Sequence, residues 1–103
     1  MPYIKGEYRE KLDKNLDKIA ELIKKINEDV PSQTRDGLLN YSLTRIMNNV
    51  YADARYHDFN ELIGFLECCK LECYRKRIAP YEDLKESENG VVKTFDLNKR
   101  NGY

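Results

Sequence analysis

The sequence predicts an all-α protein, an antiparallel bundle of three main helices in which the third helix is kinked or broken at Pro80. Three observations predict this class. Apolar residues recur every three or four positions in three separate segments, which is the spacing of one helix face. The connections between these segments are short and polar, as in helix bundles. Pro80 interrupts the third segment, because proline lacks a backbone N–H and its ring clashes with the preceding turn.

The first helix is predicted from a narrow apolar stripe of the kind that packs helix on helix. The stripe consists of Leu12, Leu16, Ile19, Ile23, Ile26 and Val30. Asp13 is a candidate internal N-cap, which would separate a short leading turn over residues 3–12. Pro31 is expected to end the helix, because the residue before a proline is disfavoured in the helical conformation.

The second helix is predicted from about Asp36 to Asp53, after the polar loop "PSQTRDG". Its apolar positions are Leu39, Leu43, Ile46, Met47, Val50 and Tyr51. Tyr41 and Tyr51 are expected to help fill the core, with their hydroxyl groups reaching its edge.

The third helix is predicted to begin at a capping box, in which Asp58 and Glu61 satisfy the free amides of the first turn. Its apolar face comprises Leu62, Ile63, Leu66, Cys69 and Cys73, so the cysteines are expected to pack as small hydrophobic residues. Asn89-Gly90 is a typical helix stop. We therefore expect one helical domain over residues 1–92 and a mobile tail over residues 93–103.

Composition restricts the class of protein. Eighteen basic and eighteen acidic residues cancel, which disfavours a general nucleic-acid binder. There is no apolar run of membrane-spanning length. Three clustered cysteines are not a disulfide framework, so the cytoplasm is the expected location. A chain of 103 residues builds only a small core, so we expect a homodimer or a higher homo-oligomer.

Short motifs distributed along the chain resemble a family of uncharacterised small helical proteins of prokaryotes and their viruses. The motifs are Met1-Pro2-Tyr3-Ile4, Leu39-Asn40-Tyr41, Thr44-Arg45, Asn60-Glu61, Ile63-Gly64, Leu66-Glu67, Lys70-Leu71-Glu72, Tyr74-Arg75, Pro80-Tyr81-Glu82-Asp83, Lys85 and Glu88-Asn89-Gly90. The resemblance covers most of residues 1–92 and implies a helical domain of unknown function, of viral or mobile-element origin. Family members usually have an aspartate after the Asn-Gly pair, where this chain has Val91.

A mixed aromatic and charged surface is predicted on the third helix. If the helix runs through Pro80, one face presents Glu67, Lys70, Tyr74, Arg77 and Tyr81, with Glu82 beyond the kink. Tyrosine and arginine are common anchors in binding surfaces. These six residues are our candidates for contact with an unknown protein or small-molecule partner. Arg45 and Arg75 are the candidates for binding phosphate, because the guanidinium fork matches phosphate oxygens.

Two functions are compatible with these residues. The first is a non-enzymatic binding or scaffold protein, since no nucleophile–base pair and no metal-ligand set is evident in the sequence. The alternative is a Mg²⁺-dependent nucleotide pyrophosphohydrolase of the all-α type, with Mg²⁺ as cofactor only in that case. Glu67 and Glu72 are five positions apart and diverge by about 140° on a straight helix, so they cannot share one ion. We therefore expect no resident metal and no other cofactor.

Overall fold

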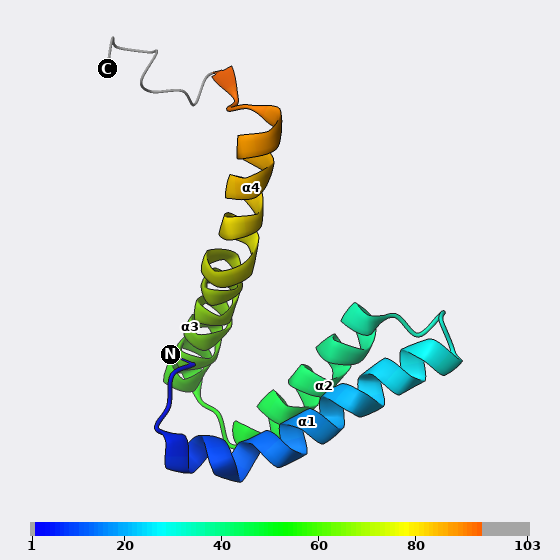
Figure 1. Ribbon diagram of the computed structural model, residues 1–103. Coiled ribbons are helices and arrows are strands. Elements are labelled where there is room, and N and C mark those ends of the chain that lie inside the picture. The colour runs from blue at the N-terminus through cyan, green and yellow to red at the C-terminus, as the bar shows by residue number, and fades with distance from the viewer. Residues whose placement is uncertain (1, 94–103) are drawn as a thin grey trace. The chain divides into compact units, whose positions relative to one another are not determined.

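The computed structural model describes residues 2–93, and no β-strand occurs in that part of the chain (Figure 1). The helices are α1 (Gly6–Asp29), α2 (Arg35–Val50), α3 (Tyr56–Cys73), η1 (Tyr74–Ile78) and α4 (Ala79–Asn89). The all-α class with three main helices is confirmed, and the third helix is assembled from α3, η1 and α4 with no loop between them. The predicted tail lies outside the described residues except for Lys93.

The chain divides into two units, unit 1 ending at Phe65 and unit 2 beginning at Leu66. The helices α1 and α2 belong to unit 1, whereas η1 and α4 belong to unit 2. The boundary falls within α3, so each unit contains part of that helix.

Helix α1 is continuous, so the prediction of an internal cap at Asp13 is wrong. The helix begins after Lys5, whose carbonyl accepts hydrogen bonds from the N–H groups of Tyr8 and Arg9 at 3.0 and 3.2 Å. The Arg9 side chain donates to the carbonyl of Ile4 at 2.7 Å, which fixes the chain just before the helix. At the other end Val30 leaves the helical region directly before the proline, as predicted.

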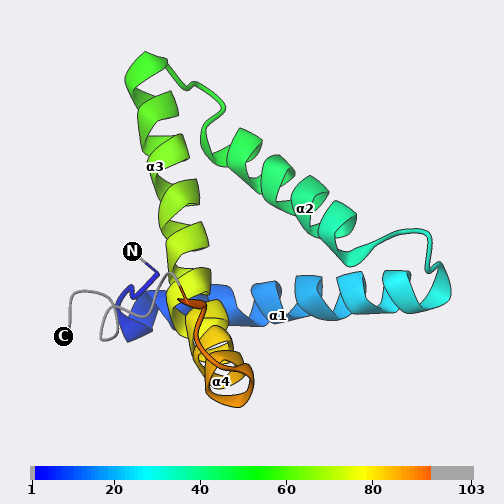
Figure 2. The ribbon, with the colours of Figure 1, turned by 90° about the horizontal axis from the view of Figure 1, so that it is seen from above.

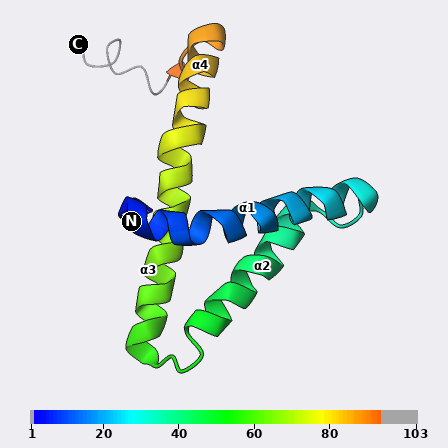
Figure 3. The same cartoon turned by 60° about the horizontal axis from the view of Figure 1, so that its bottom comes forward.

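The helices α1 and α2 form a hairpin within unit 1. They contact each other near their connecting loop and diverge away from it (Figures 2 and 3). Asn27 of α1 donates to the carbonyl of Gln33 at 2.8 Å and so ties the loop to the helix. Ile23 is 8% exposed and is the one buried residue between residues 2 and 93. The hairpin is therefore closed at its loop end and open at the other.

Helix α2 is shorter than predicted, since it begins at Arg35 and ends at Val50. Thr34 is its N-cap, and the Thr34 hydroxyl accepts a hydrogen bond from the N–H of Gly37 at 3.4 Å. Such a side chain satisfies one of the free amides of the first turn. Tyr51 is half-buried, but Tyr41 is exposed, so the prediction that Tyr41 fills the core is wrong.

Helix α3 begins two residues before the predicted capping box. The carbonyl of Arg55 accepts the first helical hydrogen bonds, which makes Arg55 the capping residue. Asp58 accepts from the N–H of Arg55 at 2.8 Å. Asp58 therefore has the role that glutamate or glutamine takes in a capping box, reaching back from the third helical position rather than occupying the cap itself.

Pro80 explains the π-helical turn η1. A proline at this position cannot donate to the preceding turn, and its ring would collide with the carbonyl four residues earlier, that of Lys76. In η1 the helix widens, and the N–H of Ala79 bonds to the carbonyl of Tyr74, five residues back. The residues on both sides keep helical dihedral angles, so the chain continues as a helix through the proline. The prediction of a helix altered at Pro80 is confirmed.

Replacing Pro80 by alanine should stabilise the third helix. The substitution restores a backbone donor and removes the clash, each of which contributes to the roughly 3 kcal/mol cost of an interior proline. We expect a gain of about 1 kcal/mol, because the π-turn already relieves part of the strain. Urea denaturation followed by circular dichroism measures it, with Pro2→Ala before α1 as control. A loss of stability in the Pro80 variant would show that the π-turn is not a response to the proline.

Candidate functional site

The predicted binding residues of the third helix lie on exposed helical surface in unit 2 and are partly engaged with neighbours. Lys70 forms an ion pair with Glu67 at 3.0 Å. The ammonium group of Lys85 lies 5.7 Å from the centre of the Tyr81 ring, within range of a cation–π contact. Arg77 has no ion-pair partner among residues 2–93. Exposed contacts of this kind contribute little to stability.

The structure brings two of these residues, Tyr74 and Glu82, into one depression next to the π-turn. A π-turn spans one residue more than an α-turn, so the helical register advances by one position across it. An open depression in unit 2 groups Tyr74 with Ile78 and Glu82, which follow one another at intervals of four residues. Its remaining lining residues are Asp83, Lys85, Glu86, Asn89, Gly90 and Val92. Arg77 and Tyr81, the members of the predicted stripe that follow Tyr74, are not among the residues that line it.

The end of this depression is fixed by Gly90. Its φ angle is 93°, in the region that residues with a Cβ rarely adopt. The N–H of Gly90 donates to the carbonyl of Glu86 at 2.8 Å, which closes α4. The predicted stop at Asn89-Gly90 is thus present, and it turns the chain so that Val92 also lines the depression.

The two candidate phosphate-binding arginines lie in different units. Arg75 forms an ion pair with Glu72 at 2.8 Å, so its guanidinium group already has a carboxylate partner. Arg45 lines a small depression on α2 with Tyr41, Thr44, Asn48 and Asn49. The neighbours of Arg45 are neutral, and they offer hydroxyl and amide groups for hydrogen bonding.

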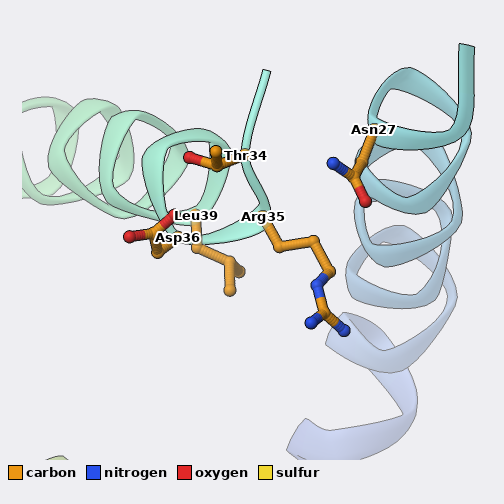
Figure 4. Close-up of a pocket in the computed structure, with 5 residues that line it drawn as sticks. All are labelled: Asn27, Thr34, Arg35, Asp36 and Leu39. Carbon is orange, nitrogen blue, oxygen red and sulfur yellow. The ribbon is translucent and has the colours of Figure 1, made fainter. Parts of the chain in front are cut away.

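A further depression lies at the loop end of the hairpin, where Figure 4 shows Arg35 extending from α2 towards α1. Asn27 points into the same space from α1, and Thr34, Asp36 and Leu39 complete the lining. Of these five residues the sequence analysis singled out only Leu39 and, as the start of α2, Asp36. Thr34 could have been found from its place directly before the first turn of α2, where threonine is a typical cap.

Asp36, which lines this depression, has a carboxyl group whose pKa is shifted by its local hydrogen bonds. A hydrogen bond with the Thr34 side chain, together with the backbone N–H groups of Gly37 and Asp36, lowers the pKa of the Asp36 carboxyl. Each of these donors stabilises the charged form. The carboxylate also lies in the first turn of α2, where the helix dipole favours negative charge. We infer that the donors at the start of α2 already have a negatively charged acceptor in Asp36, so that no bound anion is needed there.

Tyr51 shows the opposite shift. Its partial burial, and then the charge and hydrogen bond of Glu61, raise the pKa of the Tyr51 hydroxyl. Both effects favour the neutral phenol, which can donate to the carboxylate. The contact connects the end of α2 to the first turns of α3 within unit 1.

A comparison with protein families gives one match. A family described as a domain of unknown function, DUF6899, matches residues 1–92. The chain belongs to this family. No significant match was found among curated proteins or among solved structures. The DUF6899 match confirms the resemblance seen in the sequence as far as a family of unknown function, and it assigns no activity to any residue.

The cysteines of this DUF6899 chain are not packed as predicted. Cys69 and Cys73 are exposed and Cys68 is only half-buried, so the expected shared buried face is wrong for the first two. All three are free thiols. Within residues 2–93 no group of three histidine, cysteine, aspartate or glutamate side chains is placed to hold a metal ion. In the same range no helix combines the length and hydropathy needed to cross a membrane.

The shifted acidity of Asp36 predicts a pH-dependent contribution to stability. Because the folded pKa lies below the ordinary value of 3.8, the carboxylate stabilises the fold above that value, and its contribution is lost as the pH falls through the folded pKa. We expect Asp36→Asn to be less stable than wild type at neutral pH and to approach it in acid. Urea denaturation at both pH values measures this difference.

Asp17→Asn, on the exposed face of α1, is the control for the same change of charge. A deficit of the Asp36 variant that stays constant from neutral to acid pH would contradict the hydrogen-bonded carboxylate.

Proposed function

We propose that this DUF6899 protein is a non-enzymatic binding or scaffold protein of the cytoplasm, and that unit 2 contacts the partner. The observation that supports this proposal most is the absence of any buried side chain from residue 66 to residue 93. Most of the stability of a helix in a protein comes from packing one of its faces against another element. The three free thiols fit a reducing compartment. A viral or mobile-element setting rests on the family resemblance alone.

The face around the π-turn has the composition of a binding surface. Tyr74 and Ile78 are 53% and 43% exposed and lie together in the depression, bordered by Glu82 and Lys85. Large exposed aromatic and apolar side chains next to polar ones resemble the core and rim of a protein interface. π-turns inside α-helices also occur frequently at functional positions. The ion pair between Glu67 and Lys70 adds two further charged side chains, on α3.

Removing the two apolar anchors should weaken partner binding selectively. We expect Tyr74→Ala with Ile78→Ala to reduce recovery of the bound partner from native lysate by at least about tenfold, because a loss of 1.4 kcal/mol gives that factor. Quantitative mass spectrometry of pull-downs measures the recovery. Circular dichroism should show unchanged helicity, since alanine is a good helix former.

Ser87→Ala, an exposed position of α4 that does not line the depression, is the matched control and should retain the partner. If wild type recovers no protein above background, or if both variants recover it equally, binding through this face is excluded.

The competing hypothesis of a Mg²⁺-dependent nucleotide pyrophosphohydrolase is tested separately. We expect no release of phosphate or pyrophosphate from a panel of nucleoside triphosphates with Mg²⁺ or Mn²⁺, and the same background rate for Glu67→Gln. The physical reason is that catalysis of this kind needs several carboxylates converging on the ion. Turnover by wild type that is lost in Glu67→Gln would overturn the non-enzymatic proposal.

A further inference from the structure

The apolar stripe of α1 is covered along only part of its length. Near the loop, Ile23 is buried and Ile26 is half-buried in the hairpin. Further from the loop, the helices α1 and α2 diverge in Figures 2 and 3, and the same stripe is exposed. Its open members are Leu12, Leu16 and Ile19, which are 49%, 47% and 37% exposed.

A second open stripe lies on α2 of the same unit. Its members are Leu39, Leu43, Ile46 and Val50, which repeat at intervals of four, three and four residues. All four are exposed, Leu43 the least at 41%. Each hairpin therefore presents two helical stripes with the spacing found in helix bundles.

Few charged residues lie beside the open parts of the two stripes. On α1 the neighbouring positions include Asn15, Ala20 and Leu22, and Arg9 and Asp13 bring charge to one side. On α2 the positions beside Leu43, Ile46 and Val50 are Asn40, Ser42, Met47 and Asn49, whereas the charged Arg35 and Asp36 lie beside Leu39 at the loop end. The face of α1 opposite the stripe carries charged residues, namely Glu10, Lys14, Asp17, Glu21, Lys25 and Glu28. Depletion of charged residues is the compositional mark of an interface core.

We propose that the open stripes of α1 and α2 are covered by the same stripes of a second copy of this chain. Two hairpins provide four helices, and an isologous contact buries the same surface on both copies around a four-helix core. The surface suits itself because the exposed stripes of both copies are apolar. The chain has no net charge, so two copies do not repel each other at long range. The hairpin contact at Ile23 would continue directly into this core.

The experiment is sedimentation equilibrium of the full chain at micromolar concentrations, combined with thermal unfolding. We expect wild type to have twice the 12.2 kDa mass of one chain. We also expect its unfolding temperature to rise with protein concentration, because association stabilises the folded state by mass action. The thermal measurement needs no variant. A single-chain mass with an unfolding temperature independent of concentration would overturn the proposal and assign the stripes to another occupant.

The test protein carries two substitutions in the stripes, Leu16→Ala and Leu43→Ala. The control protein carries Lys18→Ala and Tyr41→Ala, on the same two helices but away from the stripes. Alanine keeps helix propensity at all four positions, so a difference between the two pairs is due to the surface. We expect the stripe pair to raise the dissociation constant of the dimer by at least about tenfold and the control pair to leave it unchanged. Equal dissociation constants for both pairs would contradict the assignment.

This inference does not depend on partner binding by unit 2. A dimer that recovers no partner contradicts the proposed function alone, whereas a monomer that recovers a partner through Tyr74 and Ile78 contradicts the self-association alone.

Discussion

Ile23, at the contact between α1 and α2, is the one side chain in residues 2–93 that is almost fully removed from water. Fixing the backbone of a single residue costs about 1–2 kcal/mol at room temperature, and apolar burial is the main term that offsets this cost. Hydrogen bonds within the helices and caps at Lys5, Thr34 and Arg55 define the local structure but bury almost nothing. Further burial of apolar side chains must therefore come from contacts beyond the hairpin. Both the proposed partner of unit 2 and the proposed second copy at α1 and α2 would supply such contacts.

Proline exerts the second constraint, on unit 2. Because Pro80 cannot donate and must avoid the preceding turn, the helix takes one extra residue at η1 and continues. The depression of unit 2 is lined by Tyr74, Ile78 and Glu82, and not by Arg77 or Tyr81. The π-turn thus lies within the segment that carries the candidate binding face.

The features of the fold that depend on apolar periodicity, proline and glycine could be predicted from the sequence. It predicted the three helical segments, the end of α1 before Pro31, the altered helix at Pro80 and the stop at Gly90. It failed at Asp13 and Asp58, because an acidic residue fits both a cap and the first turn, and backbone hydrogen bonds decide between the two. It also failed at Tyr41, Cys69 and Cys73, because periodicity shows which residues share a face but not whether another helix covers it.

The candidate face of unit 2 could not be predicted in detail for a related reason. Counting by 3.6 residues assumes one helix type, and a single π-turn invalidates the count for every residue after it. Pro80 predicts that the regular α-helix is interrupted, but the sequence does not specify whether the helix bends, stops or widens. Widening preserves the helix and changes only its register. Unit 2 therefore keeps a continuous helical surface, on which the side chains after the π-turn are rotated relative to those before it. In unit 1 the apolar stripes of α1 and α2 are exposed, and association would bury them.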